Sequence, residues 1–397
     1  MISIRNVVKV DLDIIADKGL LGDFETVVYF APITMQNEGG SSVNQLLITD
    51  EKQLDSELIV SANDSAAVLS AKNYFKNGGE KLLIINPTTY TLAGFIENIK
   101  KAKELTKDFI YICVSNQLIG DSGYTTQVIQ EIVGYCEETK SPEKLRLLFT
   151  TNSDTFIEDG LGLTDYSVAV KYSTKQGGSD SKLLDVALLI GAYFSKIDLD
   201  KADSIRDYCY TPETLYGITG DASEDLTQVK FDKLVKNENG EGYYNVIDTI
   251  GNKVVNFGGN LATTKNIAIH TDFGAIAIER DISYSVLETM LGKQYLTEQG
   301  MTNVKSAINS KLQRYKTNGY LNVGAPYSGE DLTITYNTNK YPVIKHGETL
   351  QQGFYIFSVP VADITIEDKL QKRFTPIYVI LETQSGARVV EITGEIR

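Results

Sequence analysis

The sequence contains no tryptophan, two histidines and three cysteines among its 397 residues. His270 and His346 have no cysteine or carboxylate at the spacing of a metal-binding motif, which excludes the ordinary zinc sites. Cys113, Cys136 and Cys209 form no C-x-x-C pair; Cys113 lies in an apolar run and Cys136 on the apolar side of an expected helix. We therefore expect buried, reduced thiols, with no metal and no other cofactor.

Long apolar runs and positive charge are also scarce. No stretch approaches the roughly 20 apolar residues that span a bilayer, and the start, MISIRNVVKVDLD, lacks the apolar region of a signal peptide. We expect synthesis in a cytoplasm, no export by the usual route and no membrane partner. The 38 lysines and arginines face 52 acidic residues, for a net charge of −14. Such a surface repels phosphate backbones, so we expect no nucleic-acid partner.

Catalytic motifs are missing as well. Gly120-Asp-Ser-Gly123 resembles the surroundings of some serine nucleophiles, but no histidine precedes residue 270 to act as the base. Gly160-Leu-Gly162 lacks the third glycine of a dinucleotide-binding loop, and no phosphate-binding loop of the G-x-x-x-x-G-K type is present. The acidic pairs Glu279/Asp281 and Glu137/Glu138 are explained by solvated helix faces. The sequence therefore predicts no enzyme.

Both ends of the chain have the pattern of a half-buried strand. Apolar residues alternate with polar ones at the N-terminus, interrupted only at Asn6 and Val7, and the segment DKGLLGDFE separates this strand from the next apolar run. A second alternating strand, RVVEITGEI, ends the chain. We expect strand arms over 1–22 and 377–397 that pair with other copies and make few contacts in their own subunit. Their candidate pairing residues are Ile2, Ile4, Val8, Val10, Leu12, Val390, Ile392 and Ile396.

The body between the arms divides into two regions that differ in their pattern of apolar and polar residues. From residue 23 to 210, near-continuous apolar strands alternate with amphipathic helices, which predicts an α/β domain with a mostly parallel sheet covered by helices on both faces. From 211 to 376 the chain predicts a mixed α+β region with a hairpin at 243–260, helices at 278–292 and 301–319, and then mainly strands.

One helix differs from the rest of this acidic chain. The expected helix 302–319 contains Lys305, Lys311, Arg314 and Lys316 and no acidic residue. A solvated basic helix explains this pattern, and so does a docking face for an acidic partner. Both interpretations stay open at the level of the sequence.

Several segments resemble subunits of contractile phage tail sheaths, and they occur in the same order as in that family. They are LTQVKFDKLVKNENGEGYYNVI from residue 226, the glycine-rich KVVNFGGNLATT, the stretch AIERDISYSVLETMLGKQYLTEQGMTNVKSAINSKLQRYKTNGYL, and the closing PIYVILETQSGARVVEITGEIR. NVVKVDLDI and SAAVLSAKNYFKNGGEKLLIINP resemble sheath subunits too. The chain departs from the family pattern in lacking a tryptophan near Phe273 and in being shorter than many members.

The resemblance implies a structural subunit in the contractile tail of a virion. Many copies would stack in rings or a helix around an inner tail tube, exchange terminal strands, contact baseplate and tail terminator proteins, and contract by rigid-body rearrangement. It also makes the four basic residues of 302–319 candidates for facing the tube. The alternative is a cytoplasmic α/β enzyme with a site at the carboxyl edge of the sheet, on the polar loops at Asn86, Ser115-Asn116 and Thr150–Asn152.

Overall fold

The computed structural model describes residues 7–9, 26–63, 65–106, 109–120, 122–138, 145–151, 167–171, 185, 187–195, 211–212, 245–249, 252–256, 269–292 and 294–383. The chain forms two compact units. An α/β unit comprises 19–198 and 208–269, and a C-terminal unit comprises 270–397 together with 1–18 and 199–207. The C-terminal unit thus begins near His270, later than the expected boundary at 211, because residues 208–269 group with the α/β unit.

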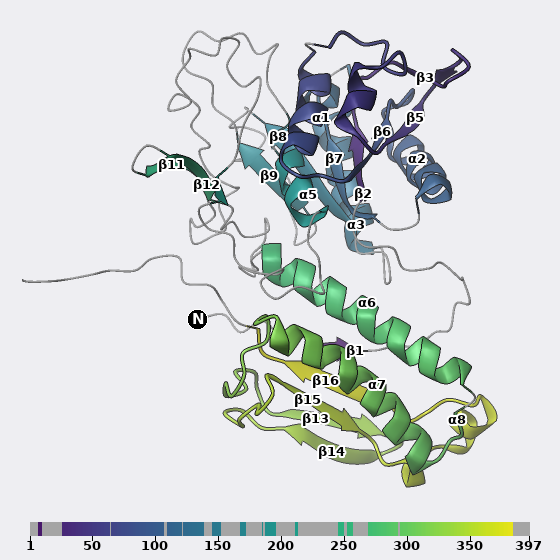
Figure 1. The fold of residues 1–397 in the computed structure, drawn as a ribbon. Coiled ribbons are helices and arrows are strands. Elements are labelled where there is room, and N and C mark those ends of the chain that lie inside the picture. The colour runs from purple at the N-terminus through teal and green to yellow at the C-terminus, as the bar shows by residue number, and fades with distance from the viewer. Residues whose placement is uncertain are drawn as a thin grey trace, which may run out of the picture. The chain divides into compact units, whose positions relative to one another are not determined.

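The α/β unit is built on a six-stranded sheet whose order is β5-β6-β2-β7-β8-β9 (Figure 1). Five strands are parallel and β5 runs antiparallel at one edge. The strands are β2 (Thr26–Phe30), β5 (Gln45–Ile48), β6 (Lys81–Ile85), β7 (Phe109–Val114), β8 (Arg146–Thr151) and β9 (Ser167–Lys171). Strands β2 and β7 are buried along their whole length, as expected for parallel strands covered on both faces. The predicted α/β class is confirmed.

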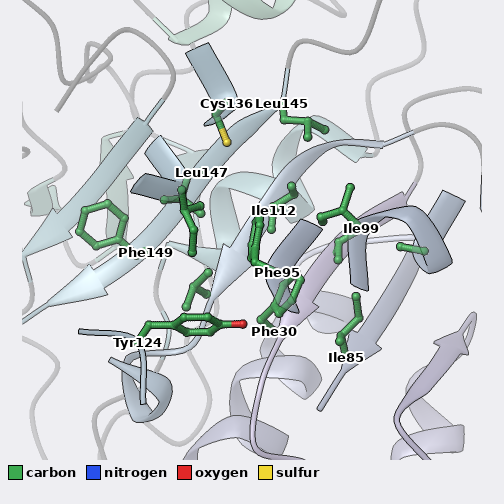
Figure 2. Packing of buried hydrophobic residues seen from close by; sticks show 14 of the residues in the cluster. Phe30, Ile85, Phe95, Ile99, Ile112, Tyr124, Cys136, Leu145, Leu147 and Phe149 are labelled. Atoms are coloured by element: carbon green, nitrogen blue, oxygen red, sulfur yellow. The ribbon is translucent and has the colours of Figure 1, made fainter. Parts of the chain in front are cut away.

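Helices cover the sheet, and alternate residues of each strand serve opposite faces. On one face, α2 (Leu92–Leu105) and α3 (Thr126–Glu138) enclose the core that Figure 2 shows, where Phe30 stacks on Phe95 with ring centroids 4.8 Å apart. On the other face, α1 (Ala66–Lys76) and α5 (Leu188–Ser195) pack together, and α5 contacts β2, β7 and β8. Cys113 and Cys136 are buried free thiols, as predicted, and Cys209 lies outside the described residues.

Smaller elements complete this unit. β3 (Met35–Gln36) pairs with β4 (Ser42–Val43). The predicted hairpin near 243–260 is confirmed as β11 (Asn245–Thr249) and β12 (Asn252–Asn256), to which β10 (Thr211–Pro212) adds. Helix α1 is capped by Ser65, whose side chain accepts from the N–H of Val68, and α5 begins at Leu188.

The C-terminal unit packs two long helices against strands (Figure 1). They are α6 (Ile269–Leu291) and α7 (Glu298–Thr317). A three-stranded antiparallel sheet, β1 (Val7–Lys9), β16 (Ile377–Leu381) and β15 (Phe354–Ser358), lies beside the hairpin of β13 (Leu332–Tyr336) and β14 (Asn339–Ile344). A short helix, α8 (Ile366–Leu370), precedes β16. Helix α6 begins earlier than the expected residue 278, because its first turns bury Phe273, Ile276 and Ala277.

Candidate assembly site

The antiparallel sheet of the C-terminal unit joins the two ends of the described chain. β16 is its central strand: Val7, Val8 and Lys9 pair with Ile380, Val379 and Tyr378 on one side, and β15 pairs on the other. Of the eight candidate arm residues, Val8 is in the described part of the chain, in β1. The other seven, Ile2, Ile4, Val10, Leu12, Val390, Ile392 and Ile396, lie outside the described residues.

The expectation that the arms 1–22 and 377–397 make few contacts in their own subunit is wrong for 7–9 and 377–381, because β1 pairs with β16 within the chain. Residues 377–381 also pair with β15, and Val379, Ile380 and Leu381 are at most 3% exposed. The physical reason is visible in the run IYVIL, which is continuously apolar and therefore suits a strand covered on both faces rather than an alternating arm.

The ladder shows which edge of β16 receives the N-terminal strand. The N–H of Val359 donates to the carbonyl of Pro376, so residue 376 and, by alternation, residues 378 and 380 point their backbone groups toward β15. Val379 then points its N–H and C=O toward β1, where Val8 is its partner. An N-terminal strand thus occupies an edge of β16 that would otherwise be open to any extended segment.

Helix α7 carries the four basic candidates, but they do not share one face. Its buried stripe is Met301, Val304, Ile308, Leu312 and Tyr315. At 100° per residue, Lys305 and Lys316 lie along one side of this stripe and Lys311 and Arg314 along the other, and all four are partly exposed. The most exposed line of the helix contains uncharged residues: Thr302, Asn303, Ser306, Ser310 and Thr317.

Arg314 already has a partner inside the unit. Its Nη1 lies 3.3 Å from Oδ2 of Asp281 on α6, and the hydroxyl of the buried Tyr315 donates to the same oxygen at 2.7 Å. Burial, followed by the neighbouring Asp281 charge, raises the pKa of Tyr315. Asp281 therefore ties α6 to α7, although the sequence indicated a solvated helix face there. The sequence carried a signal for this contact, because Asp281 lies in one expected helix and the oppositely charged Arg314 lies in the next.

At the carboxyl edge of the parallel sheet, a buried side chain of the chain itself occupies part of the alternative site. In the order β6-β2-β7, the direction of strand addition reverses between β2 and β7, where open α/β sheets bind ligands. Asp185, just before α5, is bonded to β2 and to the segment that follows β7. Its Oδ2 accepts from the Tyr29 hydroxyl at 2.5 Å, and its Oδ1 accepts from the backbone N–H of Asn116 at 2.7 Å.

Asp185 is 2% exposed, and its own N–H donates to the hydroxyl of Ser70. Burial raises the pKa of its carboxyl to about 6, against the opposing effect of the hydrogen bonds from Tyr29, Asn116 and Ser115. The Asp185 carboxyl, the Tyr29 hydroxyl and the N–H of Asn116 therefore already have hydrogen-bond partners within the chain. Asn152, part of the same candidate edge, lies outside the described residues.

The described parts of the chain contain no group of three or more histidine, cysteine or carboxylate side chains able to hold a metal ion. No helix there combines the length and apolarity that a membrane crossing requires.

Comparison with known proteins places this fold among contractile injection systems. A chain in the cryo-EM structure of the anti-feeding prophage baseplate superposes with a TM-score of 0.63, at 14% identity over 95% of this chain and 94% of that chain. A chain of the contracted helical sheath of the same prophage gives 0.62, at 13% identity over 94% of each. A chain of the contracted PVC sheath complex, an extracellular contractile injection system, gives 0.57, at 14% identity over 95% of each.

No protein-family model and no curated protein matches the sequence. At these identities the likeness concerns the fold, and it covers 94–95% of the chain. The resemblance to contractile tail sheath subunits is thus confirmed at the level of the fold.

Proposed function

We propose that this chain is a structural subunit of a contractile sheath, which polymerises around an inner tube and does no chemistry of its own. One observation carries the proposal: about 95% of the chain shares the fold of chains from two contracted sheaths and a baseplate. At the carboxyl edge of the sheet, Asp185 accepts hydrogen bonds from Tyr29 and Asn116, and these internal contacts argue against the enzyme alternative. The sheath would belong to a phage tail or to a phage-derived particle, and would reach the baseplate and terminator proteins at its ends.

The proposal includes exchange of terminal strands between copies. β1 is joined to β2 through residues 10–25, a length of chain that spans up to about 50 Å when extended. The same strand can therefore pair with β16 of a neighbouring copy as readily as with its own. Such an exchange keeps every backbone hydrogen bond of the sheet and adds a covalent link between subunits.

A pair of proline variants tests the exchange. Val8→Pro removes the N–H that faces Val379, whereas Val7→Pro removes one that faces away from β16. We expect a folded chain in both cases, but V8P should fail to polymerise while V7P polymerises. Deleting residues 1–15 should reproduce V8P. Normal polymers from V8P and from the deletion would contradict strand exchange.

We further propose that α7 faces the inner tube, with Lys305, Lys311 and Lys316 meeting acidic residues of the tube protein. Arg314 contributes less than a free cation would, because Asp281 holds it. Each exposed ion pair contributes only about 0–1 kcal/mol and is screened by salt, but many copies acting together hold an extended state that a small trigger releases.

The matched test reverses charge without touching the Asp281 contact. Lys305→Glu with Lys311→Glu should give sheaths that assemble but are contracted or lack a tube. Lys340→Glu is the control: it makes the same lysine-to-glutamate reversal at an exposed position of β14, away from α7. Normal extended sheaths from the double variant would remove α7 from the tube interface.

A further inference from the structure

Helix α8 is oriented with its apolar side chains outward. Ile366 and Leu370, one turn apart and therefore on one face, are both 79% exposed, and no residue of the helix is buried. A short helix at the surface of a folded unit ordinarily does the reverse. Burying two such side chains on folding would stabilise the unit, so a structure that leaves them in water needs a local cause.

The cause is a set of hydrogen bonds that holds the polar side of α8 inward. The Tyr336 hydroxyl donates to Oδ2 of Asp368 at 2.5 Å, and the Thr365 hydroxyl donates to the same oxygen at 2.7 Å. The Tyr341 hydroxyl donates to Asp363, just before the helix, at 2.8 Å. Both tyrosines belong to the hairpin β13–β14, so the hairpin fixes the orientation of the helix.

Figure 1 shows the end of α6 and the start of α7 at the same end of the C-terminal unit as α8. Leu291 in the last turn of α6 is 76% exposed and Tyr295 before α7 is 78% exposed. The start of α7 is bonded to the segment before α8, since the N–H of Val361 donates to Glu298 at 2.8 Å. We call Leu291, Tyr295, Ile366 and Leu370 the apolar knob. They are the most exposed large hydrophobic residues in the described parts of the chain.

The size of the knob bears on what it contacts. Even taken together, four such side chains present only on the order of 500 Å² of apolar surface. A stable two-partner interface needs about 800 Å² from each partner. The knob is therefore too small to hold a lone partner, and it suits one contact among several in a repeating assembly.

Charge indicates which surface the knob meets. The α/β unit has 20 basic against 32 acidic residues, whereas the C-terminal unit has 18 against 20, so nearly all the net negative charge lies in the α/β unit. Around the outward face of α8, exposed Lys369, Lys372 and Arg373 outnumber exposed Glu367. This net positive charge beside an apolar centre favours an acidic partner surface.

We propose that the apolar knob docks on the acidic α/β unit of a second copy of this chain, as a contact between subunits separate from the terminal strands. This contact rests on the proposed sheath function, because it requires many copies to be packed together. It also gives the two units of the chain complementary roles, one presenting the knob and the other receiving it.

A photo-crosslinking amino acid at Leu370 tests the contact in the assembled full-length chain. Mixing isotope-labelled and unlabelled chains separates links between copies from links within one copy. We expect links between copies that map to residues 19–198 or 208–269. Links to residues 384–397 of the same chain, to the C-terminal unit of another copy, or to a different protein would each overturn the proposal, as would polymers without any link.

A substitution pair gives a second measurement. Ile366→Ser with Leu370→Ser should leave the unfolding of the dilute chain unchanged, since both residues are exposed, and should raise the concentration needed for polymerisation at least about tenfold. Val323→Ser, at an exposed apolar residue of the C-terminal unit outside the knob, is the matched control. Polymerisation of the double variant at the wild-type concentration would overturn the knob contact and leave the sheath function standing. A wild-type chain that never polymerises would overturn both.

Discussion

Replacing Asp185 with asparagine should change the stability of the α/β unit in opposite directions at low and high pH. The folded pKa of about 6 lies above the ordinary value of 3.8, so the folded unit binds the proton more tightly than the unfolded chain does. The stabilisation by protonated Asp185 is fully present below about pH 4 and is lost as the pH rises through 6. The difference of about two pKa units corresponds to about 3 kcal/mol.

The asparagine side chain of the D185N variant would stay neutral at every pH, but it has one acceptor oxygen where the carboxylate has two. Its amide oxygen replaces the contact with the N–H of Asn116, and the hydrogen bond from the Tyr29 hydroxyl is lost at a cost of about 1 kcal/mol. Relative to wild type, D185N should therefore be about 1 kcal/mol less stable at pH 4 and about 2 kcal/mol more stable at pH 8.

Hydrogen exchange of the β2 and β7 amides measures this unit alone, which matters because a chain of two units need not unfold in one step. Tyr29→Phe is the contrasting variant. It removes a hydrogen bond that lowers the pKa of Asp185, so its destabilisation should grow from pH 4 to pH 8. A D185N effect of the same sign and size at both pH values would refute the buried-carboxyl argument.

Three further outcomes can be checked by denaturation or exchange. Gly274→Ala should destabilise the C-terminal unit by at least about 1–3 kcal/mol, because a Cβ there would lie 2.2 Å from the buried ring of Tyr320. Gly134→Ala in α3 should stabilise the α/β unit by about 0.5–1 kcal/mol, because a Cβ built there has no other atom within 4 Å. Equal effects of the two alanine substitutions in urea denaturation would contradict the packing argument. Tyr336→Phe should speed amide exchange in α8, and unchanged exchange would show that the Tyr336–Asp368 bond does not hold the helix.

Periodicity predicted the elements whose burial is local. The continuous apolar strands such as FIYICV and the amphipathic helices such as α2 alternate as expected, because each shows its buried face in its own sequence. The hairpin at 245–256 was predicted from a glycine- and asparagine-rich stretch between two apolar runs. The confirmed elements are those that a short window of residues determines.

Contacts between distant segments could not be predicted in this way. IYVIL was assigned to an arm, although pairing with both β1 and β15 makes it a central strand. Asp185 bonds Tyr29 across 156 positions, and the tyrosines that turn α8 lie about 30 positions before it. A carboxylate on an expected helix gives no sign of whether it faces water or a distant hydroxyl, so these parts of the candidate sites needed the fold.

Electron microscopy of the concentrated, purified full-length chain tests the sheath account most directly. The account predicts hollow tubes or stacked rings of many copies, lost in the Val8→Pro variant and retained in Val7→Pro. Small closed oligomers or monomers at every concentration, with no tubes from the wild-type chain, would contradict it.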